Sequence, residues 1–198
     1  LYMDNIREAD VTDIYVLKGG GVETWEPMFV YHGFRYAEIT GWPGTPTTAD
    51  FEGKVLYDEM PVTGTFETSN ETINQIYKNA YWGIRGNYRG MPTDCPQRDE
   101  RMGWLGDRAT GSQGESFIFG VDHRYAKWLK DIEEAQRPSG QLPDIAPNYW
   151  EGYSDNMTWP AAYVIIANML YNQYGDLEPI RNHYASMKKW LDYMNTTY

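Results

Sequence analysis

The sequence of 198 residues contains a single cysteine, Cys95, which excludes an internal disulfide framework and says little about the redox compartment. Its three histidines, His32, His123 and His183, lie far apart and show no metal-ligand spacing, so they predict no metal site. No apolar run approaches the roughly 20 residues of a membrane-spanning helix. The chain also lacks internal repeats and low-complexity segments.

Positive charge is scarce and scattered. The formal net charge is −11, and lysine and arginine form no cluster that would reverse this sign locally. A surface of this kind repels phosphate backbones and anionic lipid. We therefore expect neither nucleic acid nor a membrane surface as a partner. The chain starts at Leu1 without signal-peptide features and stops without a helix cap, which indicates an excerpt from a longer polypeptide.

Aromatic side chains, in contrast, are abundant. The chain has 8 tryptophans and 17 tyrosines, and aromatic residues make up 16% of it. Such an excess suits a large helical core or a surface that stacks on flat ligands, and sugar rings are common partners of Trp and Tyr in clefts. Composition alone therefore makes carbohydrate chemistry a working hypothesis.

Two periodicities divide the chain. Residues 1–64 contain short runs rich in Val, Ile, Tyr and Phe, separated by turns such as Gly19–Gly21, which predict antiparallel hairpins of a β-sandwich. Residues 65–198 have apolar residues at helical spacing. A capping box at Thr68 and Glu71 predicts the start of a first helix. Three further helices are expected over 122–135, 161–174 and 178–194. A buried helix followed by an amphipathic one indicates hairpins with an inner and an outer ring.

The stretch PTDCPQRDERMGWLGD, residues 92–107, shows neither helical nor strand periodicity, yet it places four carboxylates, two arginines and a tryptophan in sixteen positions. Loops at the ends of rigid helices often carry sites. Glycosidic hydrolysis needs one carboxylic acid to protonate the leaving oxygen and one carboxylate to activate water or attack carbon. Neighbouring carboxylates or an indole raise the pKa of such an acid. The stretch therefore favours a site that handles protons.

Simpler interpretations of this stretch stay open. An acidic loop taken alone is more often a solvated surface or a Ca²⁺ site. The carboxylates of Asp94, Asp99 and Asp107 are suited to Ca²⁺, although they lack the alternating spacing of a calcium loop, so the ion is possible but not required. Cys95 has no neighbouring histidine, which predicts a buried structural thiol rather than a nucleophile.

PTDCPQRDERMGWLGD closely resembles the signature of the glycoside hydrolase family 78 α-L-rhamnosidases. YHGFRYAEITG at 31–41 resembles the segment before the catalytic barrel of that family, and FETSNETINQIYKNAYWGIRGN resembles its entry helix. The resemblance extends from about Asp10 to Asp192. It implies the end of a β-sandwich domain over residues 1–64, followed over 65–198 by the start of an (α/α)₆ barrel. The barrel is incomplete, because four predicted helices do not close a ring.

The resemblance also implies roles for residues of the motif. Glu100 is the implied general acid. Asp94 and Asp107 are implied to bind rhamnose hydroxyls and to help keep Glu100 protonated, Arg98 to order the acidic cluster, and Trp104 to form an apolar wall against the sugar. The family is inverting and places its general base far downstream, and nothing in this chain matches that segment. We therefore expect the base to lie outside the chain and the chain alone to be inactive.

One departure concerns the inner helix. Many members of the family carry an acidic residue where TWPAAY has Ala161, and Asp155 or Asn156 is the alternative here. Trp150 and Trp159 are further candidates for the sugar pocket.

The resulting hypothesis is a bacterial enzyme that removes terminal α-L-rhamnose from glycosides or polysaccharides without a cofactor, because two carboxylates supply both proton transfers. A periplasmic, secreted or cytoplasmic location and the oligomeric state stay open. The alternatives are another (α/α)₆ glycosidase with a different sugar preference, or a non-catalytic carbohydrate-binding or structural fragment.

Overall fold

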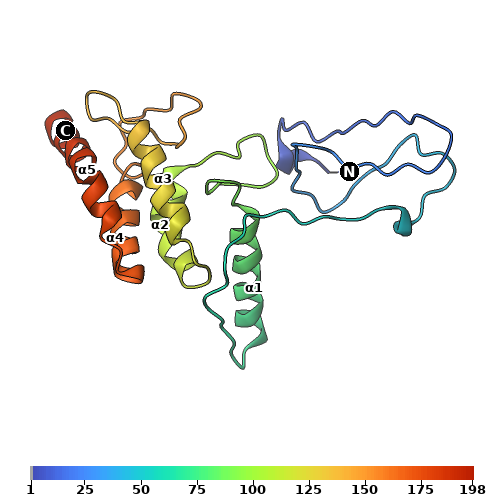
Figure 1. Ribbon diagram of the computed structural model, residues 1–198, viewed down its shortest axis with the longest axis horizontal. Coiled ribbons are helices and arrows are strands. Elements are labelled where there is room, and N and C mark those ends of the chain that lie inside the picture. Colours follow the sequence, from blue (N-terminus) through green and yellow to red (C-terminus); the bar gives the residue numbers. More distant parts are fainter. Residues whose placement is uncertain (1) are drawn as a thin grey trace. The chain divides into compact units, whose positions relative to one another are not determined.

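The computed structural model describes residues 2–198 and divides the chain into two compact units (Figure 1). The first unit comprises Leu1–Leu56 and Cys95–Arg101. The second unit comprises Tyr57–Asp94 and Met102–Tyr198.

The first unit is largely irregular. Its regular elements are two short 3₁₀ helices, η1 (Asp4–Ile6) and η2 (Thr48–Asp50), and its described residues form no strand. The β-sandwich predicted over residues 1–64 is therefore not observed. Several apolar side chains of the predicted strands are exposed, including Ile14 (82%) and Val16 (80%). β-Branched and aromatic residues favour a pleated conformation, but a sheet also needs neighbouring strands at hydrogen-bonding distance, and residues 2–64 do not supply them to one another.

The turn predicted at Gly19–Gly21 is nevertheless present. Gly19 and Gly20 adopt φ of 78° and 92°, which glycine tolerates without steric cost. The carboxylate of Glu23 accepts hydrogen bonds from the backbone N–H of Lys18 (3.1 Å) and Gly19 (3.0 Å) and from the hydroxyl of Tyr15 (2.5 Å). Local side-chain bonds thus stabilise the turn in place of a strand ladder.

The second unit is helical. Its helices are α1 (Glu71–Gly86), α2 (Leu105–Ser116), α3 (Asp122–Glu134), α4 (Ala162–Tyr174) and α5 (Glu178–Thr197). The spans predicted for the last three agree closely with the structure. α4 ends, as its sequence indicates, at Gly175 in the left-handed conformation (φ 70°). α5 continues three residues beyond the predicted end, Met194.

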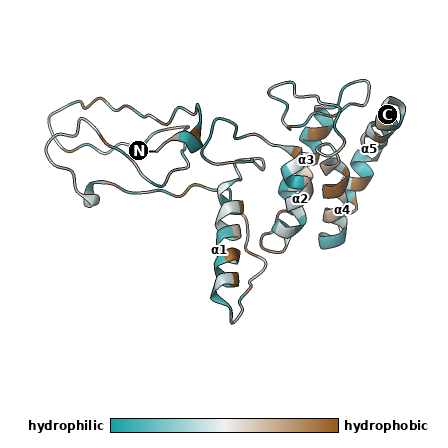
Figure 2. Ribbon diagram, turned by 180° about the vertical axis from the view of Figure 1, so that it is seen from behind, coloured by the Kyte–Doolittle hydropathy of each residue, from teal (hydrophilic) through white to brown (hydrophobic). Residues whose placement is uncertain are grey.

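α4 is the centre of the packing. It contacts α2, α3 and α5, and Figure 1 shows these helices side by side. Tyr163, Ile166 and Leu170 of α4 and Trp128 of α3 are fully buried, and Figure 2 shows the hydrophobic colour along α4. The apolar character of α4 therefore reflects contacts with several neighbours, as expected for an inner helix. No helix within residues 2–198 has both the length and the apolar composition to cross a membrane.

α1 begins differently from the prediction. Its N-cap is Asn70, whose side chain accepts from the backbone N–H of Thr72 (2.9 Å) and Ile73 (3.3 Å). The capping box predicted at Thr68 and Glu71 is therefore wrong, and Thr68 instead bonds to Asn74. Asn70 is the N-cap because its side-chain carbonyl oxygen reaches two backbone N–H groups of the first turn that have no partner within the helix.

α2 lies in a segment for which no helix was predicted. Three glycines lower its intrinsic helix propensity, and its apolar periodicity is weak. Its buried positions still recur at helical spacing, but most of them are polar; they are Leu105, Arg108, Ser112, Glu115 and Ser116. Hydrophobic patterning fails on α2 because the face it buries carries charge.

Candidate active site

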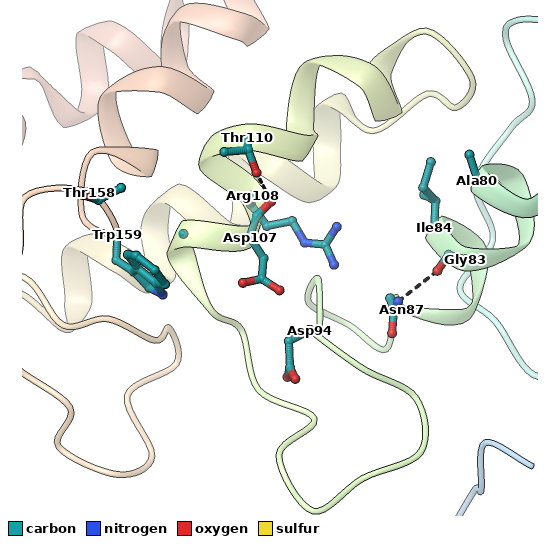
Figure 3. A pocket seen from close by; sticks show the side chains of 11 residues that line it. Ala80, Gly83, Ile84, Asn87, Asp94, Asp107, Arg108, Thr110, Thr158 and Trp159 are labelled. Carbon is teal, nitrogen blue, oxygen red and sulfur yellow. Dashed lines mark hydrogen bonds between the residues drawn. The ribbon is translucent and has the colours of Figure 1, made fainter. Parts of the chain in front are cut away.

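A pocket of about 680 Å³ lies in the second unit, within the size range of small-molecule sites. The end of α1, the first turn of α2 and the segment just before α4 form it. Figure 3 shows Asp107 and Arg108 leaving α2 toward this pocket, with Trp159 on one side and Ile84 and Asn87 on the other. Asp94 also lines it. Two carboxylates, one guanidinium and one indole therefore share a space large enough for a sugar ring.

The first turn of α2 positions Asp107. The turn is fixed by the backbone N–H of Leu105, which donates to the carbonyl of Asp144 (2.9 Å), and by the hydroxyl of Thr110, which donates to the carbonyl of Asp107 (3.2 Å). Trp104 is the N-cap and makes no side-chain capping bond. A carboxylate in the first turn lies near the positive end of the helix dipole, which stabilises its negative charge.

Trp159 packs directly on Gly106. A Cβ atom at position 106 would lie 2.5 Å from two indole ring carbons of Trp159, far inside van der Waals contact. The carbonyl oxygen of the Asn156 side chain accepts from the backbone N–H of Trp159 (2.8 Å), and its amide donates to Asp144 (2.6 Å). The indole is thus placed by the absence of a side chain at Gly106 and by the hydrogen bond to Asn156.

The two alternatives for the missing acidic residue differ in their contacts. Asp155 accepts from the side chains of Gln141 (2.6 Å) and Tyr193 (2.7 Å), and it does not line the pocket. Asn156 acts on the pocket through the backbone of Trp159. Neither side chain is a lining residue, so the polar lining here comes from other positions.

Asp94 is fixed by a pair of bonds to one residue. Its backbone N–H donates to the carbonyl of Met102 (3.1 Å), and its carboxylate accepts from the N–H of Met102 (2.8 Å). The preceding residue, Thr93, is buried and donates from its backbone N–H to the carbonyl of Asn87 (2.7 Å). The backbone of Asp94 and of the residue before it is therefore held.

Arg108 belongs to a buried polar network. Its guanidinium donates to the Glu115 carboxylate and to the carbonyl of Thr93. Glu115 also accepts from the hydroxyls of Tyr88 and Tyr125, the latter at 2.5 Å. Burial, and next the charge of Glu115, raises the pKa of Tyr88; burial also raises the pKa of Tyr125. Burial opposes the charged form of Arg108, but the negative charge of Glu115 prevails and raises its pKa.

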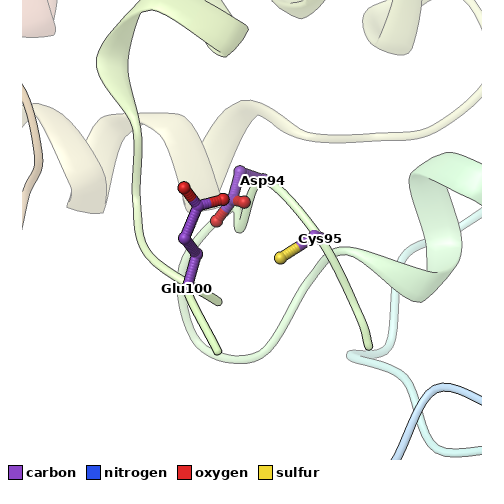
Figure 4. A group of neighbouring side chains, drawn as sticks. All are labelled: Asp94, Cys95 and Glu100. Carbon is purple, nitrogen blue, oxygen red and sulfur yellow. The ribbon is translucent and has the colours of Figure 1, made fainter. Parts of the chain in front are cut away.

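The loop Cys95–Arg101 belongs to the first unit and contains Arg98 and Glu100. Arg98 Nε lies 2.6 Å from one Glu100 oxygen, and Arg7 Nη2 lies 3.3 Å from the other. Cys95 is buried, as predicted, and its sulfur accepts from the N–H of Arg101 (3.4 Å). Figure 4 shows Cys95 and Glu100 on the two arms of this loop. Two arginines thus orient the Glu100 carboxylate.

The residues predicted for the site are only partly brought together. Asp94, Asp107 and Trp159 line the pocket, whereas Trp104 and Trp150 do not. Trp104 is half-buried ahead of α2, and Trp150 is 49% exposed. The roles assigned to these side chains, and to Arg98 and Glu100, stay predictions.

The sequence analysis missed four polar lining residues, namely Asn87 at the end of α1, Arg108 and Thr110 on α2, and Thr158 before α4. Arg108 directly follows the charged motif, and this position was the available signal, because a residue next to a site carboxylate lies on the same helical turn.

Two protein-family models match this chain. Residues 61–198 match the six-hairpin glycosidase domain of bacterial α-L-rhamnosidases, and residues 1–57 match their concanavalin-like domain. The domain division predicted between residues 64 and 65 stays a prediction.

Similar proteins include an α-L-rhamnosidase of Streptomyces avermitilis, 39% identical over 98% of this chain and 19% of its own length. One of Formosa agariphila is 36% identical over 99% of this chain and 21% of its own length. The chain thus spans about one fifth of these relatives.

Solved structures give the same result. The crystal structure of the Streptomyces avermitilis α-L-rhamnosidase complexed with L-rhamnose has a TM-score of 0.94 and 39% identity over 99% of this chain and 19% of its own. The α-L-rhamnosidase structure from Dictyoglumus thermophilum has a TM-score of 0.84 and 45% identity over 87% of this chain and 19% of its own. With residues 61–198 matched by its glycosidase domain, the chain belongs to the bacterial α-L-rhamnosidase family.

Proposed function

We propose that this chain forms part of an α-L-rhamnosidase, a glycoside hydrolase that releases terminal α-L-rhamnose from glycosides or polysaccharides. The observation that carries the proposal is the pocket lined by Asp94, Asp107 and Trp159 in a chain of this family. The whole enzyme's substrate is inferred from its relatives, one of which was crystallised with L-rhamnose.

The pocket chemistry suits a deoxy sugar. Rhamnose carries hydroxyls that donate hydrogen bonds to carboxylates, and Asp94 and Asp107 supply two of these acceptors. It also carries a methyl group and an apolar ring face, which suit the indole of Trp159. A pocket with acceptors and one apolar wall therefore favours a sugar of this type over a charged or wholly polar ligand.

In the proposed reaction Glu100 is the general acid that gives its proton to the glycosidic oxygen as the bond to C1 breaks. Arg98 and Arg7 contact its two oxygens and so fix its orientation. Water, deprotonated by a second carboxylate outside this chain, attacks C1 from the opposite face, so the product has inverted configuration. The two carboxyl groups account for both proton transfers, so the reaction needs no cofactor. Residues 65–198 would form the first part of an (α/α)₆ barrel.

Substitution of Glu100 in the full-length protein tests the acid assignment. Glu100→Gln should abolish hydrolysis of unactivated rhamnosides, because the amide has no proton to give, while L-rhamnose binding measured by calorimetry stays nearly intact. Asp99→Asn is the matched control: it removes the neighbouring carboxylate, which pairs with Arg7 (2.8 Å), and should retain turnover. Normal turnover by Glu100→Gln would show that another group is the acid.

Two further assays separate this function from its rivals. A panel of aryl glycosides distinguishes an α-L-rhamnosidase from a six-hairpin glycosidase with another sugar preference, and absence of turnover on every substrate would indicate a non-catalytic protein. NMR of the first-formed rhamnose anomer tests inversion, and a product of retained configuration would contradict it.

A further inference from the structure

We infer that Arg108 is a positioning residue for rhamnose binding: its guanidinium holds the backbone next to Asp94 against α2, so that the Asp94 carboxylate stays aimed into the pocket. The inference rests on the proposed function. Arg108 is only 8% exposed, yet it lines the pocket, so it is part of the floor rather than a surface charge.

The guanidinium of Arg108 bonds to two groups at once. One terminal nitrogen donates to Glu115, two turns further along α2, and the other donates to the carbonyl of Thr93. Thr93 immediately precedes Asp94. A planar guanidinium presents its donors in a fixed arrangement, so one side chain sets the distance between the helix and the Thr93 backbone.

Arg108 is itself held by a buried hydrogen-bond network. Both oxygens of Glu115 have partners, because one accepts from Arg108 and the other from the hydroxyls of Tyr88 and Tyr125. The two tyrosine hydroxyls also lie 3.1 Å apart, within hydrogen-bonding distance. A fully bonded buried network is rigid, whereas a partly bonded one is costly. The raised pKa of each phenol keeps both as hydrogen-bond donors in neutral and mildly alkaline solution.

The positioning role of Arg108 is distinct from its contribution to stability. A buried ion pair often adds little net stability compared with apolar groups of the same size, so stability alone does not account for the charge here. Asp94 has a second anchor, since its carboxylate accepts from the N–H of Met102 (2.8 Å). Met102 thus orients the Asp94 carboxylate, and Arg108 holds the backbone carbonyl of the preceding residue, Thr93. Loss of the Arg108 contact should let the carboxylate drift while the fold persists.

The test compares two variants in the full-length protein. Arg108→Met/Glu115→Gln removes both charges but keeps an acceptor for the tyrosines, so its unfolding temperature should stay near that of the unmodified protein. Arg108→Lys keeps the charge, but an ammonium does not reproduce the fork. We expect both to bind L-rhamnose about tenfold to about a hundredfold more weakly, as the loss of a hydrogen bond between a sugar hydroxyl and a carboxylate would cause. KM for an aryl rhamnoside should rise more than kcat falls.

Arg124 offers a matched control. It likewise donates to a carboxylate, Asp58 (2.7 Å), and to a backbone carbonyl, that of Glu59, but it does not line the pocket. Arg124→Lys should leave L-rhamnose affinity and KM unchanged. If the control weakens binding as much as Arg108→Lys, the effect is a general loss of structure and the inference fails.

The remaining outcomes are also decisive. Unchanged L-rhamnose affinity in both Arg108 variants would overturn the inference while the proposed function stands, provided the unmodified protein hydrolyses the aryl rhamnoside. The inference would also be overturned if the Arg108 variants lost L-rhamnose affinity only to the extent that a smaller fraction of each variant is folded. An unmodified protein that neither binds L-rhamnose nor hydrolyses the substrate would overturn the proposed function, and the inference with it.

Discussion

Gly106 should be the most sensitive position in the pocket to a small change. It occupies the first turn of α2, and the ring of Trp159 lies on it. Replacing Gly106 with alanine adds one methyl group at the point where the indole approaches the helix most closely. No charge, hydrogen bond or lining carboxylate is altered, so the experiment isolates the placement of Trp159.

The structure sets the size of this perturbation. The new Cβ would lie 2.5 Å from the nearest indole carbons, and ordinary contact begins at 3.4 Å, so the ring has to move by 3.4 − 2.5 = 0.9 Å. Overpacking of this kind typically costs about 1–3 kcal/mol. If the cost falls on sugar binding, at about 1.4 kcal/mol per factor of ten, kcat/KM for a rhamnoside should fall about fivefold to about 150-fold.

Gly114→Ala is the matched control for this prediction. Gly114 lies on the same helix, and a methyl group added there would have no other atom within 4 Å. Alanine at this position should increase the free energy of unfolding by about 0.5–1 kcal/mol through helix propensity, with kcat/KM unchanged. The assays are hydrolysis of an aryl α-L-rhamnoside, calorimetric binding of L-rhamnose, and urea unfolding of both variants.

The refuting result is specific. If Gly106→Ala retains full kcat/KM and full affinity for L-rhamnose, then the ring of Trp159 does not contribute to the sugar site in its present position. If both glycine variants lose activity equally, helix rigidity rather than the indole is responsible.

Asn156→Ala should lower the free energy of unfolding by about 1 kcal/mol and raise KM, because the hydrogen bond from the backbone N–H of Trp159 to the Asn156 side chain is lost; urea unfolding and steady-state kinetics check this, with Asp155→Asn as the control. The free energy of unfolding should also decline above about pH 10, the ordinary pKa of tyrosine. The raised pKa of Tyr88 and of Tyr125 keeps both protonated in the folded state while they ionise in the unfolded state, so stability is complete below about pH 10 and is lost as the pH rises. Urea titrations from about pH 8 to about pH 11 should show a smaller decline for Tyr125→Phe, and an identical decline would contradict this account.

The helices that could be predicted from sequence have apolar residues at helical spacing, and α1 was predicted in this way although none of its residues is buried. α3, α4 and α5 follow that rule, and Gly175 marks the end of α4. α2 does not follow it, because Arg108 and Glu115 occupy buried positions that a hydrophobic pattern assigns to solvent. The predicted sandwich was not observed, because strand formation depends on pairing partners that residue type does not specify.

The candidate site shows the same limit. Asp94, Asp107 and Trp159 were identified by motif and type, and they line one pocket. The type of a side chain does not specify its direction, however, so nothing in the sequence distinguished Trp159 from the exposed Trp150. The contact that separates them is the approach of the Trp159 ring to Gly106.

The charged interior of α2 also bears on how this protein would respond to selection for heat resistance. Apolar replacements for the pair Arg108 and Glu115 are an obvious route to a tougher scaffold, since hydrophobic groups of equal volume often match or exceed a buried ion pair. The same replacements would remove the hydrogen bond from Arg108 to the Thr93 carbonyl, next to the pocket residue Asp94. Directed evolution that selects only for survival after heating should therefore accumulate variants that are more heat-stable but have lower turnover. The trade-off between thermal stability and turnover would lie in one helix, α2.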